Sequence, residues 1–440
     1  MSSICYSQQW SVVPSISPDV SRNLLRGVWG NSSNDVWAVG ETSLLPIKTL
    51  VQHWNGTEWT LVNSPSPGTQ TNVLVAVEGT SSDNVYAVGY KSNNSTPQML
   101  VVHWDGSSWE ENSAPTVTGG SGLQTICVFS PDDIYAGGYK AVGAPGPTTG
   151  NLITHWNGSA WSIEDSPNQS SNRSNYITDI KGISPDDIWA VGYSRTITGN
   201  FKNMVLHKTG SSWDIISVPQ PGLENHLYNL DIIASDNIRI TCQFNDGSQY
   251  NACFLHYDGS NWTVESSPGG GADIIHNSAN DIWSTGSNIV HYDGTSWSEV
   301  SAPVPAGGSM LSMIRISSAD VWAVGRFIDG EDMKSLIMHF GGTTSISGSD
   351  IISDNYELSQ NYPNPFNPVT VIRYSLSANT PVELKIYNSL GKEITELVNE
   401  IQNTGTHSVE WNAAGFPSGI YFYTISANDF KDTKRMILLK

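Results

Sequence analysis

A seven-residue pattern that begins with histidine recurs along most of this chain. One copy, HWDGSSW, spans residues 103–109. The others are HWNGTEW (53–59), HWNGSAW (155–161), HKTGSSW (207–213), HYDGSNW (256–262), HYDGTSW (291–297) and a truncated HFGG (339–342). A second pattern precedes each copy, as NDVWAVG (34–40), DNVYAVG (83–89), DDIYAGG (132–138), DDIWAVG (186–192), DNIRITC (236–242), NDIWSTG (280–286) and ADVWAVG (319–325). Because the two patterns return together every ~40 to 50 residues, the chain is built from repeated units of that size.

Each unit contains four short runs of strand-forming residues. In the first unit they span residues 25–29, 36–40, 50–54 and 59–63, and turn-forming residues separate them. The Asp or Asn that precedes the second run is expected to bond its own backbone in a tight turn. Asp-Gly or Asn-Gly between the third and fourth runs indicates a hairpin. Four antiparallel strands in each repeated unit predict an all-β protein with a β-propeller.

The two ends of the repeat region complement each other. The seventh unit stops at HFGG and lacks a fourth run, whereas residues 8–18, QQWSVVPSISP, resemble the fourth run and exit of the first unit, TEWTLVNSPSP. The N-terminal strand is therefore expected to complete the last blade, with Trp10 in the position of Trp59. Such closure removes an exposed sheet edge. It predicts a seven-bladed propeller over residues 1–342.

The repeated histidines and tryptophans are interpreted as packing residues. Fourteen of the sixteen tryptophans fall in three repeat positions, and only Trp29 and Trp411 do not. Seven of the ten histidines share one position, namely His53, His103, His155, His207, His256, His291 and His339. Seven side chains spaced around a ring cannot converge on one metal or substrate. Each histidine is expected to bond a backbone or turn group of its own blade, while the aromatic rings fill the wedges between blades.

The charge of the chain excludes two classes of partner. The net charge is −20, and residues 1–345 carry 31 acidic and 14 basic side chains. Nucleic acids and anionic membranes both need Lys or Arg to displace their counterions. No apolar run of about 20 residues is present, so no membrane span is predicted. No phosphate-binding loop, zinc-protease motif or nucleophile elbow occurs either.

Candidate ligand-binding residues lie in the loops that vary between units, because variable loops on a rigid scaffold often carry binding sites. Tyr90, Tyr139 and Tyr193 each follow the second run of a unit, and Arg195 and Arg326 lie in two of these loops. Aromatic faces beside polar groups suit a sugar or a peptide chain. The alternative is that the tyrosines pack against the loop of the neighbouring blade.

Two further local features leave alternatives open. Asp329, Glu331 and Asp332 offer oxygen ligands for Ca²⁺, but they lack the spacing of a calcium loop and also fit a solvated acidic turn. Cys242 and Cys253 flank a turn-rich segment, and two alternatives are open: a disulfide across a hairpin, or two free thiols. No motif requires a cofactor, and no catalytic residue is assigned.

The repeat unit resembles two known propeller groups. It shares part of the aspartate turn of sialidase-type propellers, D-x-G-x-x-W, and the W-x-V-G and D-G-x-x-W elements of photosystem-assembly-type propellers. A sialidase needs clustered arginines, whereas the seven arginines before residue 346 are scattered and Arg315 lies in IRIS, outside that family's motif. Propeller polysaccharide lyases use a histidine or tyrosine base. His226 and His276 are the two propeller histidines outside the repeated position.

The composition changes after HFGG. Residues 343–355 are rich in Gly, Ser and Thr and predict a flexible linker. Residues 356–440 contain about seven short alternating runs, typical of a small Ig-like β-sandwich. The motifs NYPNPFNP (361–368), VELKIYNSLGKEI (382–394) and SGIYFYTI (418–425) resemble the type A C-terminal sorting domain of type IX secretion. The residues that carry this resemblance are Asn361, Tyr362, Pro363, Asn364, Pro365, Phe366, Asn367, Pro368, Gly419 and Tyr421.

The resemblance implies a route of export. It makes the type IX secretion machinery a partner, places the protein outside the cell or on the outer-membrane surface, and implies cleavage in the linker. An ordinary Ig-like accessory module is the alternative. The N-terminus, MSSICYSQQW, has no signal-peptide pattern, so a leader is expected to be missing from this sequence.

Three functions fit these features. The first is a secreted or surface binding protein, with an adhesive role, for a glycan or a protein at the variable-loop face. The second is a carbohydrate-active enzyme, a lyase or a hydrolase, on the same scaffold. The third is a structural protein of a surface layer or filament.

Overall fold

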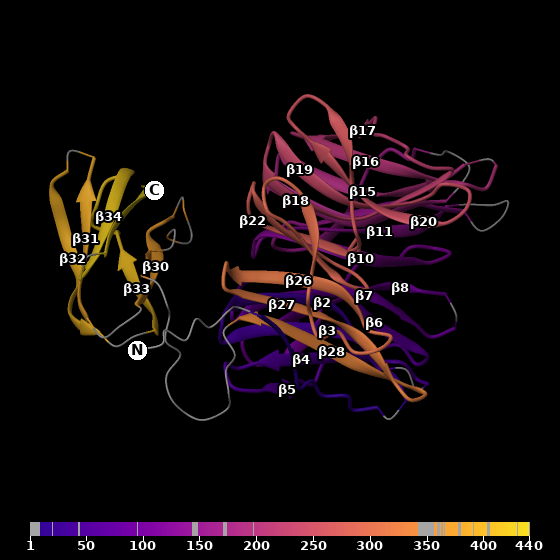
Figure 1. Ribbon diagram of the computed structural model, residues 1–440, viewed down its shortest axis with the longest axis horizontal. Helices are drawn as coiled ribbons and strands as arrows, with labels where there is room; N and C mark the ends of the chain where they lie inside the picture. The colour runs from indigo at the N-terminus through magenta and orange to yellow at the C-terminus, as the bar shows by residue number, and fades with distance from the viewer. Residues whose placement is uncertain are drawn as a thin grey trace. The chain divides into compact units, whose positions relative to one another are not determined.

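The computed structural model of the protein contains two compact units, residues 1–343 and 344–440. It describes residues 9–19, 21–42, 45–94, 96–142, 148–169, 174–196, 198–341, 356–358, 361, 364, 366–376, 380–389, 391–402, 405–428 and 430–439. These residues form strands, turns and loops (Figure 1). Nowhere in these ranges is there a helix with the length and apolar character needed to cross a membrane. The predicted linker, residues 343–355, lies outside the described part of the chain.

The first unit consists of four-stranded antiparallel sheets, which we number in chain order. Sheet 1 contains β2 (Asn23–Ser32), β3 (Asp35–Thr42), β4 (Lys48–Trp54) and β5 (Trp59–Leu61). Sheet 2 contains β6 (Thr71–Ser81), β7 (Asn84–Ser92), β8 (Gln98–Trp104) and β9 (Trp109–Glu111). Sheet 3 contains β10 (Ser121–Ser130), β11 (Asp133–Val142), β12 (Thr148–Trp156) and β13 (Trp161–Glu164).

The remaining sheets of this unit repeat the order. Sheet 4 contains β14 (Asn175–Ser184), β15 (Asp187–Arg195), β16 (Phe201–Thr209) and β17 (Ser212–Ile216). Sheet 5 contains β18 (Glu224–Ala234), β19 (Asn237–Asn245), β20 (Tyr250–Tyr257) and β21 (Trp262–Ser266). Sheet 6 contains β22 (Asp273–Ser278), β23 (Asp281–Thr285), β24 (Ile289–Tyr292) and β25 (Trp297–Val300). Sheet 7 contains β26 (Ser309–Ser317), β27 (Asp320–Asp329), β28 (Asp332–Gly341) and β1 (Gln9–Val13).

The sheets form a closed ring. The first strand of each sheet contacts the first strand of the next, from β2 through β6, β10, β14, β18 and β22 to β26, which contacts β2 again. Figure 1 shows the orange strands β26–β28 beside the indigo strand β2. The N-terminal strand β1 pairs antiparallel with β28, and Trp10 lies opposite Phe340. The propeller fold and its closure by the N-terminal strand are as predicted.

The glycine that ends the second pattern lies opposite a bulge in the first strand of its sheet. We call this first strand the innermost strand, because the first strands contact one another around the ring. In sheet 1 the pairing of β2 with β3 shifts between Leu25 and Gly27. A Cβ added at Gly40, opposite this bulge, would lie 1.9 Å from the carbonyl oxygen of Leu24. Gly89, Gly138, Gly192 and Gly325 have the same close approach at 1.9–2.0 Å. The glycine is therefore required by the bulge, since any side chain there would clash with backbone.

The repeated tryptophans fill the spaces between sheets. Trp59 in sheet 1 packs on Trp322 in sheet 7, with ring centroids 5.5 Å apart. Trp109 packs on Trp37 in the same way at 5.4 Å, and Trp10 packs on Trp283 at 6.0 Å. Fourth-strand and second-strand aromatics thus meet across each of these boundaries, as predicted. Burial of each such side chain stabilises the ring by about 1.5–3 kcal/mol.

The repeated histidine links the third strand of its sheet to the beginning of the second strand. In all seven sheets its Nε2 lies 2.6–3.0 Å from the side-chain oxygen of the Asp or Asn that begins the second strand. In six sheets the imidazole also packs on the second-strand Trp or Tyr, with centroids 3.8–4.4 Å apart. Sheet 5 has Arg239 at that aromatic position, and Arg239 pairs with Glu265. The bond lies within the histidine's own blade, as expected, but its partner is a strand side chain and not a backbone or turn group.

The role expected for that Asp or Asn is wrong. It does not bond its own backbone, because its side-chain oxygen accepts from the histidine instead. The residue that bonds nearby backbone lies in the turn between the third and fourth strands. Asp105 Oδ1 accepts from the backbone nitrogens of Ser107 and Ser108 and from the Ser107 hydroxyl at 2.7–2.9 Å. These bonds lower the pKa of Asp105 to about 2. The polar side chains of the HWDGSSW copy therefore bond residues of their own sheet and its turns.

The second unit is a small β-sandwich with one shared core. One sheet contains β29 (Glu357–Leu358), β30 (Val369–Leu376) and β33 (Gly405–Asn412). The other contains β32 (Glu393–Gln402), β31 (Thr380–Asn388), β34 (Gly419–Ala427) and β35 (Phe430–Leu438). Their inner faces pack Ile372 and Trp411 of the first sheet against Leu384 and Tyr423 of the second.

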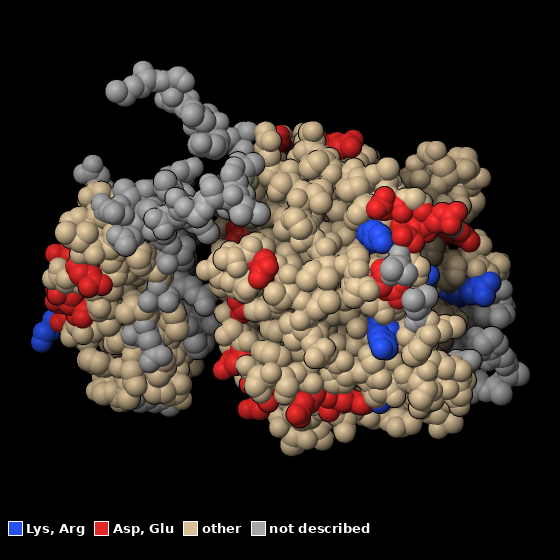
Figure 2. All heavy atoms as spheres, turned by 90° about the horizontal axis from the view of Figure 1, so that it is seen from below, with Lys and Arg blue, Asp and Glu red and all other residues tan. Residues whose placement is uncertain are grey.

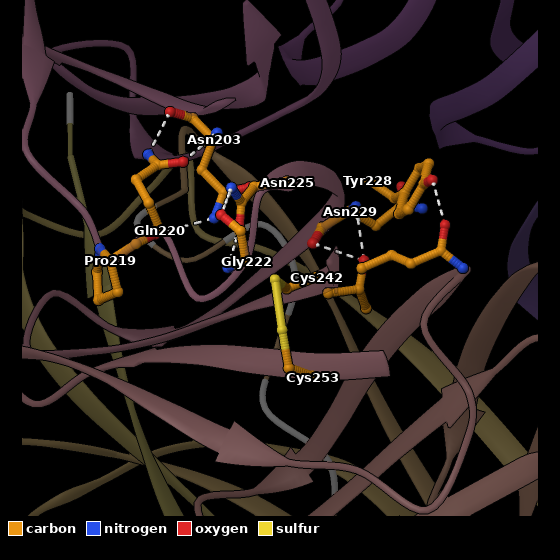
Figure 3. The surroundings of a disulfide bond; sticks show 11 residues. Asn203, Pro219, Gln220, Gly222, Asn225, Tyr228, Asn229, Cys242 and Cys253 are labelled. Carbon is orange, nitrogen blue, oxygen red and sulfur yellow. Dashed lines mark hydrogen bonds between the residues drawn. A yellow bond between two sulfur atoms is a disulfide. The ribbon is translucent and has the colours of Figure 1, made fainter. Parts of the chain in front are cut away.

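A disulfide joins Cys242 and Cys253 across the β19–β20 hairpin, resolving the alternative that the sequence left open (Figure 3). The two residues face each other in the register of the hairpin and are almost fully buried. Figure 3 also shows Tyr228 and Asn229 of the adjacent strand β18. Tyr228 donates to Gln243 Oε1, and the Asn229 nitrogen donates to the Thr241 hydroxyl.

Replacement of Trp322 by Ala tests the wedge packing. Trp322 is 2 % exposed and contacts Trp54, Trp59 and His339. We expect the free energy of unfolding to fall by about 3–5 kcal/mol, because a large buried ring is lost from a tightly packed site. Denaturant unfolding followed by fluorescence measures it. The matched control is Leu61→Ala on β5, which is 46 % exposed and should change stability little. Equal effects of the two variants would contradict the packing interpretation.

Candidate functional site

The tyrosines predicted from the sequence lie at one end of the ring. Tyr90, Tyr139 and Tyr193 each follow the bulge-facing glycine, near the ends of β7, β11 and β15. This end carries the loops between second and third strands and the connections between sheets. The short turns between first and second strands lie at the opposite end. The loops that vary between units therefore share one face of the ring.

A continuous row of aromatic rings crosses sheets 3, 4 and 5 on this face. We call it the tyrosine arc and define it as Tyr139, Tyr176, Tyr193, Phe201, His226 and Tyr228. The centroid of Tyr176 lies 5.8 Å from Tyr139 and 5.2 Å from Tyr193. Each ring touches the next, so the surface is preorganised.

His226 lies at the centre of the second half of the arc. Its ring is 4.8 Å from Tyr193, 4.7 Å from Phe201 and 6.3 Å from Tyr228. The sequence analysis singled out His226 only as a histidine outside the repeated position. It missed Tyr176, Phe201 and Tyr228, because none of them falls in either repeated pattern. The tyrosines do pack against the neighbouring sheet, as the alternative held, since Tyr139 of sheet 3 meets Tyr176 of sheet 4.

The polar atoms of the arc are largely unused. Among the described residues, the hydroxyls of Tyr139, Tyr176 and Tyr193 have no hydrogen-bond partner, and the rings are partly buried. Tyr228 is the exception, because its hydroxyl donates to Gln243 at 3.0 Å. His226 Nδ1 is buried and has no partner in the same ranges. A surface of contiguous rings with free hydroxyl and imidazole groups can stack on a ligand and bond it at once.

Burial favours the uncharged forms of Tyr139, Tyr193, Tyr228 and His226. It raises the pKa of Tyr139 and of Tyr228 to about 12, and the pKa of Tyr193 is raised as well. Burial lowers the pKa of His226, and Glu224 opposes this shift without cancelling it. The phenols therefore stay protonated and the imidazole stays neutral.

The two predicted arginines do not converge with the tyrosines. Arg195 is exposed, donates from Nε to the Gly199 carbonyl at 3.1 Å, and lies 5.9 Å over the Phe201 ring at one end of the arc. Arg326 lies in sheet 7 and donates to the Met333 sulfur at 3.6 Å. Tyr90 lies in sheet 2, beyond the other end of the arc. The ion pair of Arg26 and Glu41 acts on it, with Arg26 Nε 2.6 Å from Glu41 Oε2. Only Tyr139 and Tyr193 of the predicted set belong to the arc.

The acidic segment proposed for Ca²⁺ is a hairpin turn. Asp329 lies opposite Asp332 where β27 turns into β28, and Asp332 contacts Lys334 at 3.3 Å. Within the described ranges no three His, Cys, Asp or Glu side chains are grouped as a metal site.

Two hollows accompany these features. One, with a volume of about 270 Å³, lies in the β7–β8 loop on the variable-loop face and is lined by Lys91, Ser92, Asn93, Asn94, Thr96 and Gln98. A larger one of about 580 Å³ lies between sheets 2 and 3, and its walls include His103, Glu110, Trp156 and Trp161. His103, Trp156 and Trp161 occupy repeat positions whose role is packing, so the larger volume does not by itself indicate a site.

Charged side chains also project from the innermost strands into the ring. Asp179 accepts from the Thr125 hydroxyl at 2.6 Å and from the Leu230 nitrogen at 3.0 Å, and so links sheets 3, 4 and 5. Asp273 accepts from the Met313 nitrogen at 2.8 Å and links sheet 6 to sheet 7. These two carboxylates are fully used by the structure.

Four carboxylates surround one lysine inside the ring. Lys181 lies on β14, and its side chain is exposed to solvent. Desolvation by the surrounding protein lowers its pKa, but Asp179, Glu78, Asp231 and Asp273 raise it above the usual range. Desolvation in turn raises the pKa of Glu78 to about 7 and that of Asp273 to about 6. His276 Nδ1 lies 2.6 Å from Asp231 within the same group.

The motif residues of the second unit form a seam against its last strand. The Phe366 nitrogen donates to the Ile437 carbonyl, and the Leu439 nitrogen donates to the Phe366 carbonyl. Asn364 accepts from the Ile437 nitrogen, and buried Asn361 donates to Thr370 Oγ1. Tyr362, Pro363 and Pro365 lie outside the described residues.

The other motif residues belong to the same unit. The Ala413 nitrogen donates to the carbonyl of Pro368, next to exposed Asn367. Gly419 begins β34, and the Tyr421 hydroxyl donates to the Pro417 carbonyl at 2.8 Å. The motif therefore holds the sandwich together.

Residues 360–439 match the family described as the secretion system C-terminal sorting domain. The match implies export through type IX secretion and hence a secreted or cell-surface protein. A sequence comparison with curated proteins gives no match.

Two solved structures are similar to this chain. One is YCF48 bound to D1 peptide, with a TM-score of 0.51 and 13 % identity over 76 % of this chain and 97 % of that chain. The other is PorZ of Porphyromonas gingivalis, described as an essential bacterial surface component of the type-IX secretion system. It gives a TM-score of 0.50 and 15 % identity over 94 % of this chain and 59 % of that chain. Identities this low establish the propeller fold and nothing about ligands.

Replacement of Glu78 by Gln tests the charged group inside the ring. The pKa of Glu78 is raised, so folding favours its protonated form. Its contribution to stability is present in full below about pH 4.5 and is lost as pH rises through about 7. Relative to the native chain, Glu78→Gln should gain on the order of 1–2 kcal/mol between pH 4.5 and 8, less than the full shift because the side chain is partly exposed.

Denaturant midpoints across this pH range measure the effect. Glu58→Gln, an exposed residue of the first hairpin turn, is the matched control and should show no such trend. A Glu78→Gln stability curve parallel to that of the native chain would contradict the assignment.

Proposed function

We propose that this is an exported binding protein whose propeller holds a glycan or protein ligand on the tyrosine arc. The observation that carries the proposal is the row of contiguous, partly buried rings whose hydroxyl and imidazole groups have no partner among the described residues. The hydroxyls of Tyr139, Tyr176 and Tyr193 are not enclosed by protein, so a ligand that lies on the rings can replace the water around them.

The charge of the propeller shapes the range of ligands. On the face that Figure 2 shows, Asp and Glu side chains are more widespread than Lys and Arg. With a net charge of −20, the chain would repel a strongly anionic ligand. Neutral or cationic chains would not.

The similar structures are consistent with binding on this fold. The YCF48 structure contains a bound peptide, and PorZ is described as a surface component of the same secretion system that the sorting domain implies. Because the identities are low, these properties support the proposal only as precedents.

A carbohydrate-active enzyme is the second candidate. The His276–Asp231 pair inside the ring favours it, because a carboxylate within 2.6 Å orients an imidazole for proton transfer. Release of shortened sugar products in the binding assays below would favour this candidate over simple binding.

Parallel glycan and peptide arrays test the binding proposal. The full chain should bind a set of probes on one array, and Tyr193→Ala should reduce that binding about tenfold, because one ring contact and one free hydroxyl are lost. Tyr257→Ala in sheet 5 is the matched control, since that tyrosine packs between sheets beside Trp262. Unchanged binding by the Tyr193 variant, or no binding to either array, would refute the site.

Removal of residues 356–440 tests the export route. In a bacterium with a type IX system we expect the shortened chain to stay inside the cell, because the sorting domain directs passage across the outer membrane. Immunoblots of cells and medium measure this. Mass spectrometry of the exported full chain should find its end between residues 343 and 355. Export of the shortened chain, or retention of residues 356–440 on the mature surface form, would contradict this route.

A further inference from the structure

We propose that the ligand of the tyrosine arc is an uncharged polysaccharide or oligosaccharide and that His226 is its central hydrogen-bonding contact. The inference rests on the proposed function, because it takes the arc as the binding surface. It adds the chemical class of the ligand and a residue that determines specificity.

His226 differs from every other described histidine of the propeller. The seven repeated histidines each bond an Asp or Asn, and His276 bonds Asp231. His226 has ring contacts on three sides and no hydrogen bond within the described ranges, and its Nδ1 is buried. Nδ1 is enclosed by the surrounding protein, and leaving it unpaired costs about 1–3 kcal/mol. The nitrogen that the imidazole offers to a ligand is therefore Nε2, which is not enclosed and has no hydrogen-bond partner among the described residues.

The polar groups of the arc match sugar hydroxyls. A neutral imidazole carries one donor and one acceptor, and each tyrosine hydroxyl both donates and accepts. Every hydroxyl of a sugar also does both. The C–H face of a sugar ring can lie against an aromatic face while its hydroxyls reach the neighbouring polar atoms. The unused groups of Tyr139, Tyr176 and Tyr193 follow one another along the arc, which suits a chain of sugar units.

The charged group that acts on the centre of the arc is an anion, because Glu224 acts on His226. The ionisable groups that act on Tyr139 are Tyr90 and Tyr176, and the one that acts on Tyr193 is Tyr176. Arg195 lies at the far end, over Phe201, and its Nε donates to Gly199. An acidic sugar would bring carboxylates toward Glu224 on a protein of net charge −20. Uncharged sugars avoid that cost.

Peptide ligands fit the same surface less well. Charged peptides need ion pairs that the arc lacks. Proline-rich peptides dock on aromatic grooves, but proline has no N–H, so such a ligand would leave the acceptor atoms of the arc without partners. The number of unused donors and acceptors favours a hydroxyl-rich ligand.

Affinity electrophoresis of the full chain tests the proposal. The gels contain neutral polysaccharides, namely a glucan, a mannan and a xylan, or the acidic polysaccharides alginate and polygalacturonate. We expect retardation by at least one neutral polysaccharide and by neither acidic one. His226→Ala should weaken the binding constant about 10-fold or more, and Tyr193→Phe, which removes one hydroxyl and keeps the ring, about 2- to 10-fold.

The control variant is Tyr257→Phe. Tyr257 lies at the opposite end of sheet 5 and donates to the Gly259 carbonyl at 2.9 Å, so its loss of a hydroxyl should not change binding. Equal thermal unfolding midpoints for the variants separate lost contacts from lost folding. His226→Gln keeps a donor and an acceptor and should retain more binding than His226→Ala.

The pH dependence gives an independent readout. Binding should be constant from about pH 6.5 to 8 and weaken below that range, because protonation removes the acceptor of His226, whose pKa burial lowers. Preference for an acidic polysaccharide, or full binding by His226→Ala, would overturn the inference. Binding on a peptide array that depends on Tyr193, with no glycan binding, would overturn the inference while the proposed binding surface stands. No Tyr193-dependent binding to any probe would overturn both.

Discussion

The fold depends on a contact that is repeated in six of the seven sheets. A histidine at the end of the third strand packs on the aromatic ring of the second strand and bonds the Asp or Asn that begins that strand. In sheet 1 these are His53, Trp37 and Asp35. The fourth-strand tryptophan of the next sheet packs on the same ring, as Trp109 does on Trp37. One set of side chains thus fixes the strands within a sheet and the spacing between sheets, which leaves the loops at the other end free to vary.

The sequence predicted most of the fold because the repeated residues are the ones that hold it together. Their spacing identified the strands, and the truncated last repeat identified the closing strand. Strand bounds were less accurate. The sequence predicted the first strand of sheet 1 at residues 25–29, whereas the strand extends over Asn23–Ser32. The prediction was too short because the residues at the two ends of the strand carry no strand signal. The role of Asp35 was misjudged, since its partner His53 lies on another strand and local turn chemistry does not reveal it.

The candidate site was predicted only in part. Tyr139 and Tyr193 were found because they follow a repeated glycine. Tyr176 and His226 lie near the starts of innermost strands, and their meeting depends on how neighbouring sheets pack, which no local pattern records. The one usable signal was that His226 broke the histidine pattern. The charged group around Lys181 was missed for the same reason, as its members come from separate strands of the ring.

Closure of the ring by both ends of its chain has a consequence for export. Ser11 and His339 are 328 positions apart in sequence, yet they are adjacent in sheet 7. During synthesis or passage through a membrane, the first strand must wait unpaired until the last hairpin emerges. Contacts at such long range slow folding. The ring is therefore complete only after β28, the strand that precedes the second unit, has been synthesised.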